Sequence, residues 1–151
     1  GSAYILSARQ LPLDPRDQMS LPGADDDTPV AALKAEIRRF VEARDWDQYH
    51  FPKDLAIGLS IEAAELLEHF RFRSNEEIAA ALQDEAFRRE VGHELADVLY
   101  FVLLLAANLG LDATGILRDK LALSARKYPV DQARGSNRKY THYTPDSDTG
   151  G

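Results

Sequence analysis

Two long stretches of this sequence combine apolar residues with acids and contain no basic residue. Neither Lys nor Arg occurs at positions 54–70 or 90–117, although the 151-residue chain has 18 of them. The apolar residues of both stretches recur at helical spacing, and no segment shows the alternation and hairpin turns of strands. A hydrophobic content of 44% in a chain of this length fits one globular domain. We therefore predict an all-α fold, a helical bundle.

Capping signals predict where the helices begin and end. Thr28-Pro29 reads as an N-cap followed by proline at the first helical position, and the helix that it starts should run to about residue 45. The aromatic segment 46–53 contains a proline and predicts a loop. Further helices are predicted at about 54–72, after the capping box Ser74/Glu77, at about 85–109 before Gly110, and from the cap Asp112 to the Tyr128-Pro129 stop.

The regions outside the predicted catalytic domain, residues 28–129, have a different composition. Residues 1–27 are rich in proline and acids and predict a flexible arm, in which Gly1-Ser2 is typical of a cloning remnant. Residues 130–151 form a basic C-terminal segment and tail. No secretory signal and no cysteine are present, which favours a cytoplasmic location. The longest uncharged apolar run, 98–107, is half of the roughly 20 residues that cross a bilayer, so no membrane is expected.

The charge of the chain is unevenly distributed. The net charge is -7, yet residues 118–140 hold seven Lys/Arg and two Asp. Binding to nucleic-acid polymers depends on Lys and Arg that neutralise many phosphates, so an acidic body argues against such a partner. The local basic segment could still serve one small polyphosphate.

Four acids are candidates for a metal site. Glu62 and Glu65 are three residues apart on one predicted helix, and Glu94 and Asp97 on another, so each pair projects from one helical face. A solvated acidic face is the alternative interpretation. However, these acids have mostly apolar neighbours, and no Lys or Arg lies within helical reach to neutralise them.

A divalent cation would relieve the repulsion between such carboxylates. Two of them at ~4 Å repel by about 4 kcal/mol at an effective dielectric constant near 20. All-oxygen ligands favour Mg²⁺, with Mn²⁺ as the alternative, and indicate phosphate chemistry. A di-iron bundle is the rival metal site, since Glu90 and His93 form one ExxH motif. The second motif is missing because His69 follows Glu65 by four, and neither histidine is part of the predicted site.

Four ordered motifs carry a family resemblance over residues 33–143. They are RDWDQYHFPKDL at 44–55, IEAAELLEHFRF at 61–72, HELADVLYF at 93–101 and KLALSARKYPVDQARGSNRKY at 120–140. Together they resemble the all-α MazG-like nucleotide pyrophosphohydrolases, within them most closely the dCTP pyrophosphatase branch. The resemblance implies hydrolysis of dCTP or a base-modified dCTP to the monophosphate and pyrophosphate, as house-cleaning of the nucleotide pool.

The resemblance also implies roles for individual residues. Glu62, Glu65, Glu94 and Asp97 would be the metal ligands or water-activating carboxylates. Among them, we predict Glu65 as the general base. Trp46 resembles the tryptophan of the family that stacks on the nucleotide base. The alternative is that Trp46 only packs at the end of the first helix. The residues expected to bind substrate are Trp46, Lys53, Phe72, Phe101, Lys120, Arg126, Lys127, Arg138 and Lys139. For each basic residue the alternative is ordinary surface charge, and the match at 136–140 favours Arg138 and Lys139.

Some residues depart from the pattern expected in close relatives. Ile37, Asp54, Phe72 and Ser124 stand where a histidine, an asparagine, a tryptophan and an asparagine are expected, which puts base selectivity in question. A broad-specificity nucleoside triphosphate pyrophosphohydrolase therefore stays open. A non-catalytic helical nucleotide-binding module with a vestigial metal site is the alternative from another class.

Two further expectations concern assembly and the C-terminal segment. The helix at 95–107 is apolar nearly all round, so subunits are expected to bury it in a homo-oligomer, and the resemblance suggests a tetramer. Residues 130–140 contain a glycine and several basic residues, which suits a segment that is mobile when empty and folds over a triphosphate. A solvated basic tail is the alternative.

Overall fold

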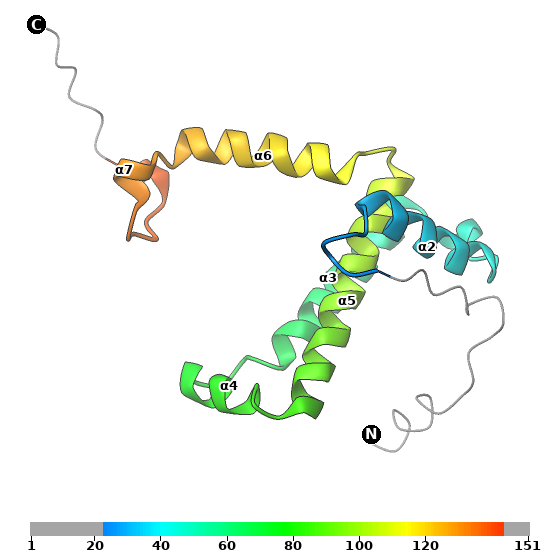
Figure 1. Ribbon diagram of the computed structural model, residues 1–151, viewed down its shortest axis with the longest axis horizontal. Coiled ribbons are helices and arrows are strands. Elements are labelled where there is room, and N and C mark those ends of the chain that lie inside the picture. The colour runs from blue at the N-terminus through cyan, green and yellow to red at the C-terminus, as the bar shows by residue number, and fades with distance from the viewer. Residues whose placement is uncertain (1–22, 144–151) are drawn as a thin grey trace, which may run out of the picture. The chain divides into compact units, whose positions relative to one another are not determined.

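The computed structural model describes residues 23–143, which form helices and turns only (Figure 1). The chain divides into two compact units, and the boundary between them follows Gly110. The first contains α2 (Val30–Glu42), the 3-10 helix η2 (Asp47–Tyr49), α3 (Pro52–Glu68), α4 (Asn75–Ala81) and α5 (Glu85–Asn108). The second contains α6 (Ala113–Lys127), α7 (Val130–Ala133) and the 3-10 helix η3 (Tyr140–His142). The predicted all-α class is confirmed, whereas the domain boundary after residue 129 stays a prediction.

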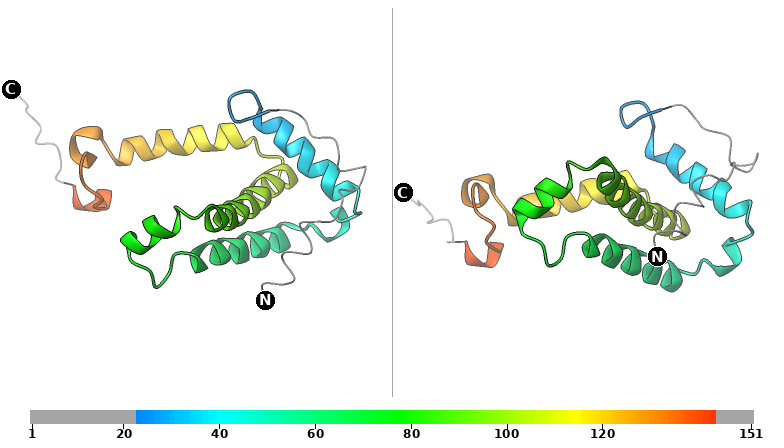
Figure 2. Two further views of the ribbon diagram at one scale, coloured as in Figure 1. Left: turned by 60° about the horizontal axis from the view of Figure 1, so that its bottom comes forward. Right: turned by 90° about the horizontal axis from the view of Figure 1, so that it is seen from below.

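Helices α3 and α5 lie side by side and form the body of the first unit, and α2 packs against α5 (Figures 1 and 2). Their buried centre is Val41, Leu55 and Leu104. Gly58 of α3 faces the Phe101 ring of α5, where an added Cβ would lie 2.5 Å from Cε1 of that ring. The absence of a side chain at this position therefore sets how closely the two helices approach.

The start of α2 differs from the sequence expectation. Pro29 is itself the N-cap, with an extended backbone (φ -61°, ψ 148°), so the helix begins at Val30. The predicted capping role of Thr28 is wrong, because no side chain caps this helix and the Thr28 hydroxyl lies 3.4 Å from the Asp27 carboxylate instead. Helix α2 ends at Glu42, and Asp45 then adopts a left-handed backbone (φ 52°), which aspartate tolerates better than most residues.

Helix α3 is shifted towards the N-terminus relative to the prediction. It begins at Pro52, because proline at the first position needs no amide donor, and it ends at Glu68 rather than near residue 72. The chain then turns, and Phe72 takes a left-handed conformation (φ 62°) that a bulky side chain rarely adopts. The last four residues of the predicted helix therefore form this turn.

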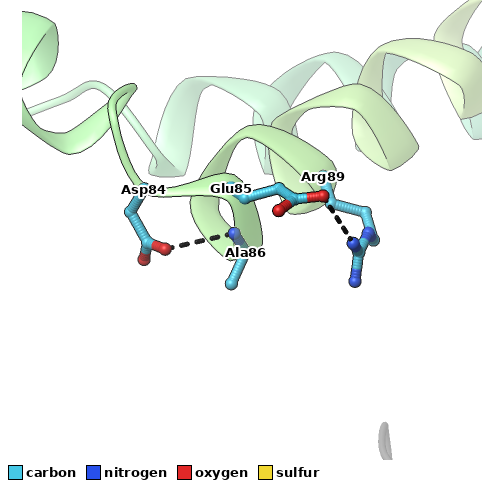
Figure 3. A network of polar contacts seen from close by, with 4 residues as sticks. All are labelled: Asp84, Glu85, Ala86 and Arg89. Atoms are coloured by element: carbon cyan, nitrogen blue, oxygen red, sulfur yellow. Dashed lines mark hydrogen bonds and ion pairs between the residues drawn. The ribbon is translucent and has the colours of Figure 1, made fainter.

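Other caps follow the prediction. Ser74 accepts a hydrogen bond from the Glu77 amide (3.1 Å), Asp112 accepts one from the Gly115 amide (2.7 Å), and Gly110 ends α5 with a positive φ of 68°. One cap was not predicted: Asp84 accepts a hydrogen bond of 3.2 Å from the Ala86 amide at the start of α5 (Figure 3). Glu85 and Arg89 form an ion pair of 3.3 Å one turn further on (Figure 3).

Both ends of the described chain have local structure that the sequence did not predict. The short helix α7 occupies residues 130–133, where no element was expected, and Gly135 turns the chain after it (φ 73°). Of the predicted N-terminal arm, residues 1–22 lie outside the described residues, and 23–27 form a turn in which the Ala24 amide donates to Asp27 (2.6 Å).

Within residues 23–143, no single helix is both long and apolar enough to cross a membrane. Only α5 and α6 taken together, as a broken pair, meet the same test of length and composition.

Candidate active site

Three of the four predicted metal ligands come together where α3 lies along α5. One carboxylate oxygen from each of Glu62, Glu65 and Glu94 lies within 4.8 Å of the other two. Glu62 and Glu65 are one helical turn apart on α3, and Glu94 approaches them from α5, as the spacing predicted. Glu62 and Glu94 are partly buried and Glu65 is exposed, so the cluster opens to solvent on one side.

Burial, and then the neighbouring carboxylates, raise the pKa of two of these carboxyls. Burial, a hydrogen bond shared with Glu65, and then the charges of Glu65, Asp97 and Glu94 raise the pKa of Glu62 to about 7. The pKa of Glu94 is raised by burial first and then by Glu65 and Asp97, whereas His69 lowers it. At neutral pH the cluster is therefore poised to exchange a proton for a cation.

The donor atoms fit a divalent cation. Among the described residues, Glu62 Oε2 and Glu94 Oε2 are buried and have no hydrogen-bond partner. A buried carboxylate oxygen without a partner is costly unless a cation or a proton satisfies it. The donor set is all oxygen, which suits a hard cation rather than zinc. The three carboxylates could thus hold one metal ion.

Asp97 and His69 border the cluster. Asp97 is exposed and is not among the ligand atoms gathered within 4.8 Å, although its charge raises the pKa of both Glu62 and Glu94. His69 is not part of the predicted site, yet its Nε2 lies 4.0 Å from Glu94 Oε1 and its ring packs edge-on against Phe87 (5.7 Å). Its spacing of four residues from Glu65 predicts only that it lies on the same side of the helix as Glu65, not that it approaches Glu94 of α5.

The predicted aromatic residues lie in three different settings. Trp46 follows α2, is partly exposed and packs edge-on against Phe40 (5.7 Å). Phe72 is 94% exposed, and its ring lies 5.0 Å from the Arg71 guanidinium carbon. Phe101 is partly buried and packs edge-on against Tyr100 (5.1 Å) beside the core.

The predicted basic residues are exposed and belong to both units. Lys53 lies in the first turn of α3. Lys120, Arg126 and Lys127 lie on α6, and Lys127 and Arg126 occupy its last turn. Arg138 and Lys139 follow α7 in the second unit, at the start of η3.

A separate cavity of about 260 Å³ lies between α2, η2 and α5. Its lining includes Lys34, Arg38, His50 and Asn108 among apolar side chains, and none of the predicted site residues lines it. Ile37, one of the departures from the expected pattern, contributes to its wall and also packs against the core.

Comparisons with known proteins identify relatives of this chain. The family model described as MazG-like family matches residues 57–142. Human dCTP pyrophosphatase 1 is 33% identical over 129 residues, which cover 83% of this chain and 75% of the human protein. The bovine dCTP pyrophosphatase 1 is 36% identical over 112 residues, covering 74% of this chain and 64% of the bovine protein.

A solved structure shares the fold. The crystal structure of a pyrophosphatase from Archaeoglobus fulgidus superimposes with a TM-score of 0.63 at 34% identity and covers 73% of this chain and 99% of that one. The family match includes most of α3 and all of α5, and with them the three residues of the carboxylate cluster. This chain belongs to the MazG-like family.

Proposed function

We propose that this protein hydrolyses dCTP, or a base-modified dCTP, to the nucleoside monophosphate and pyrophosphate and so removes it from the nucleotide pool. The class of enzyme, a nucleoside triphosphate pyrophosphohydrolase, follows from the family and from its dCTP pyrophosphatase relatives. The deoxycytidine base is the finer proposal and comes from the names of those relatives. The observation that carries the chemistry is the cluster of Glu62, Glu65 and Glu94 with its unpartnered oxygens.

Glu62, Glu65 and Glu94 would hold Mg²⁺, or Mn²⁺ as its substitute, with Asp97 completing the set. Bound there, the cation would neutralise phosphate charge and make the α-phosphorus more electrophilic. The partnerless oxygens of Glu62 and Glu94 support this assignment.

The carboxylates would also handle the proton. A water molecule attacks the α-phosphorus in line, the bond to the bridging oxygen of the β-phosphate breaks, and pyrophosphate leaves. Glu65 is proposed as the general base that takes the proton of this water, because it is the exposed member of the cluster and so the one that substrate and solvent can reach.

Residues of both units are proposed to bind the nucleotide. Trp46, Phe72 and Phe101 are proposed for the base and sugar, since an aromatic face contributes about 1–3 kcal/mol per stacked base. Cationic side chains are proposed for the triphosphate, where charge-assisted hydrogen bonds are strong. They are Lys53, Lys120, Arg126, Lys127, Arg138 and Lys139.

A broad-specificity enzyme is the second candidate. Ile37 packs against the core and offers no hydrogen bond to a base, and Phe72 likewise has no polar atom where a tryptophan is expected. Selection of one base requires polar groups that are left unpaired by the wrong one. These departures therefore favour a wider range of bases.

A panel of nucleoside triphosphates with Mg²⁺ tests both candidates, with products separated by chromatography. dCTP should give dCMP and pyrophosphate, and Glu65→Gln should remove most of this activity. Glu68→Gln, an exposed position on the same helix that pairs with Arg71 (2.9 Å), is the matched control and should retain activity. dCDP and orthophosphate as first products would refute the mechanism, and equal rates on all bases would favour the broad-specificity enzyme.

We also propose that the chain assembles as a homo-oligomer, a tetramer. Ile57 and Ile61 on α3, and Leu95, Leu99 and Val102 on α5, are about half exposed at spacings of three or four residues, so each helix presents an apolar face. A second copy that covers these faces would remove them from water. Light scattering should report a tetramer, and a strict monomer would contradict the proposal. A cytoplasmic location stays a prediction.

A further inference from the structure

Three tyrosine rings join the end of α6 to the end of the described chain. The Tyr128 ring packs edge-to-face on Tyr140 and on Tyr143, with centroids 5.8 Å apart in both pairs and interplanar angles of 83° and 82°. The Lys127 ammonium lies 5.3 Å from the centre of the Tyr140 ring. The chain that leaves α6 through α7 doubles back (Figure 1). The ring contacts of Tyr128 with Tyr140 and Tyr143 close this loop.

The loop is also held from within. Gly135 makes the turn with its positive φ, and the Ser136 amide donates to the Ala133 carbonyl oxygen (3.0 Å). Arg138 donates to the Ser136 hydroxyl from its backbone amide (3.3 Å) and from its guanidinium Nε (3.2 Å). The backbone on both sides of Arg138 and Lys139 is therefore fixed by contacts inside the loop.

We propose that Tyr128 is a positioning residue, which folds residues 128–143 before substrate arrives and so holds Arg138 and Lys139 ready for the triphosphate. The inference rests on the proposed function of those two cations. Edge-to-face ring pairs stabilise a fold beyond the area that they bury, and side chains ordered in advance lose less entropy on binding. The segment is then preformed, in contrast to the sequence expectation that it is mobile when empty.

Trypsin digestion of the nucleotide-free, full-length protein tests whether the loop is preformed, because Arg134, Arg138 and Lys139 are all cleavage sites within it. Cleavage there should be slow in the wild type and at least tenfold faster in Tyr128→Leu, equivalent to about 1.4 kcal/mol of local opening. Tyr128→Phe keeps the ring and should stay within twofold of wild type. Cleavage after Arg38, inside α2, requires that this helix opens, so it serves as the internal control for global unfolding.

Equal cleavage of wild type and Tyr128→Leu would overturn the proposal, as would equal acceleration by Leu and Phe. If Tyr128→Leu also accelerates cleavage after Arg38, a second pair of variants, at Tyr143, tests the proposal. The Tyr143 hydroxyl is buried and has no hydrogen-bond partner within residues 23–143. Tyr143→Phe should therefore leave the loop protected from trypsin, and Tyr143→Leu should expose it. Any other result refutes the proposal that the tyrosine rings hold the loop.

Steady-state kinetics on dCTP separate this inference from the proposed function. Arg138→Ala and Tyr128→Leu should each lower kcat/KM about tenfold, chiefly through KM, and Tyr128→Phe should not. If Arg138→Ala keeps full kcat/KM, the proposed contact with the triphosphate is wrong. If Arg138→Ala loses activity while Tyr128→Leu keeps it, the contact stands and the positioning role of Tyr128 is wrong.

Discussion

Replacing Glu62 by glutamine should stabilise the metal-free protein at high pH. Its pKa is raised from the ordinary 4.5 to about 7 by burial and by the neighbouring carboxyls, so the folded state disfavours the charged form. The penalty is absent below pH 4.5, grows as the pH rises to about 7, and is constant above that. Glutamine keeps the shape of the side chain but carries no charge, and removes the penalty.

The expected gain follows from the size of the pKa shift. A rise from 4.5 to about 7 is equivalent to about 3 kcal/mol, and screening by solvent at this partly exposed site reduces it to on the order of 1–2 kcal/mol. At pH 8 with EDTA, Glu62→Gln should therefore melt roughly 2–8 °C above wild type in a protein of this size. At pH 4.5 the two proteins should melt together.

Urea unfolding and thermal melts at fixed protein concentration, at both pH values, measure this difference. With Mg²⁺ at pH 8, wild type should instead melt above Glu62→Gln. At an Mg²⁺ concentration of 100 times the Kd, binding stabilises wild type by about 2.7 kcal/mol, whereas the variant lacks one of the ligands. Glu90→Gln, exposed on the same helix as Glu94, is the control and should change little. A variant that is destabilised at pH 8 without metal, or a gain that does not depend on pH, would refute the reasoning.

Three other substitutions follow from the fold. Gly58→Ala should lower the stability by about 1–3 kcal/mol in urea unfolding, since its Cβ would meet the Phe101 ring at 2.5 Å; an unchanged midpoint would mean that α3 and α5 can separate freely. Phe72→Gly removes a left-handed strain of about 1–2 kcal/mol and should melt no lower than wild type, yet its KM for dCTP should rise if the ring contacts the base. Ser74→Ala should cost about 1 kcal/mol through loss of the cap on Glu77, and an unchanged melting temperature would show that α4 frays already.

The helices were predictable because local chemistry marks their ends. Ser74, Asp112 and Gly110 each act within a few residues, so their caps and stops can be identified from the sequence. The start of α2 was not predicted correctly, because either Thr28 or Pro29 can be the N-cap. The extended backbone at Pro29 makes Pro29 the N-cap, and the sequence does not encode this choice. Helix α7 was missed because four residues offer no periodicity to recognise.

The carboxylate cluster was predictable for a similar reason. A spacing of three residues on a helix fixes a shared face, so the sequence alone places Glu62 and Glu65 together and predicts that Glu94 lies opposite them. Contacts that join distant parts of the chain could not be predicted in this way. The approach of His69 to Glu94 and the closure of Tyr140 on Tyr128 depend on how helices and turns fold back, which spacing along one helix does not encode.

The small core described for the first unit has a consequence for how stability is measured. Few large side chains are fully buried in one copy, and Val41 and Leu55 are the largest of them within residues 23–143. If subunits cover the half-exposed faces of α3 and α5 as proposed, folding and association form one equilibrium, and its midpoint depends on the total protein concentration. Dilution then favours unfolded monomers. A tenfold lower protein concentration should lower the melting temperature, and activity per molecule should fall in the most dilute assays.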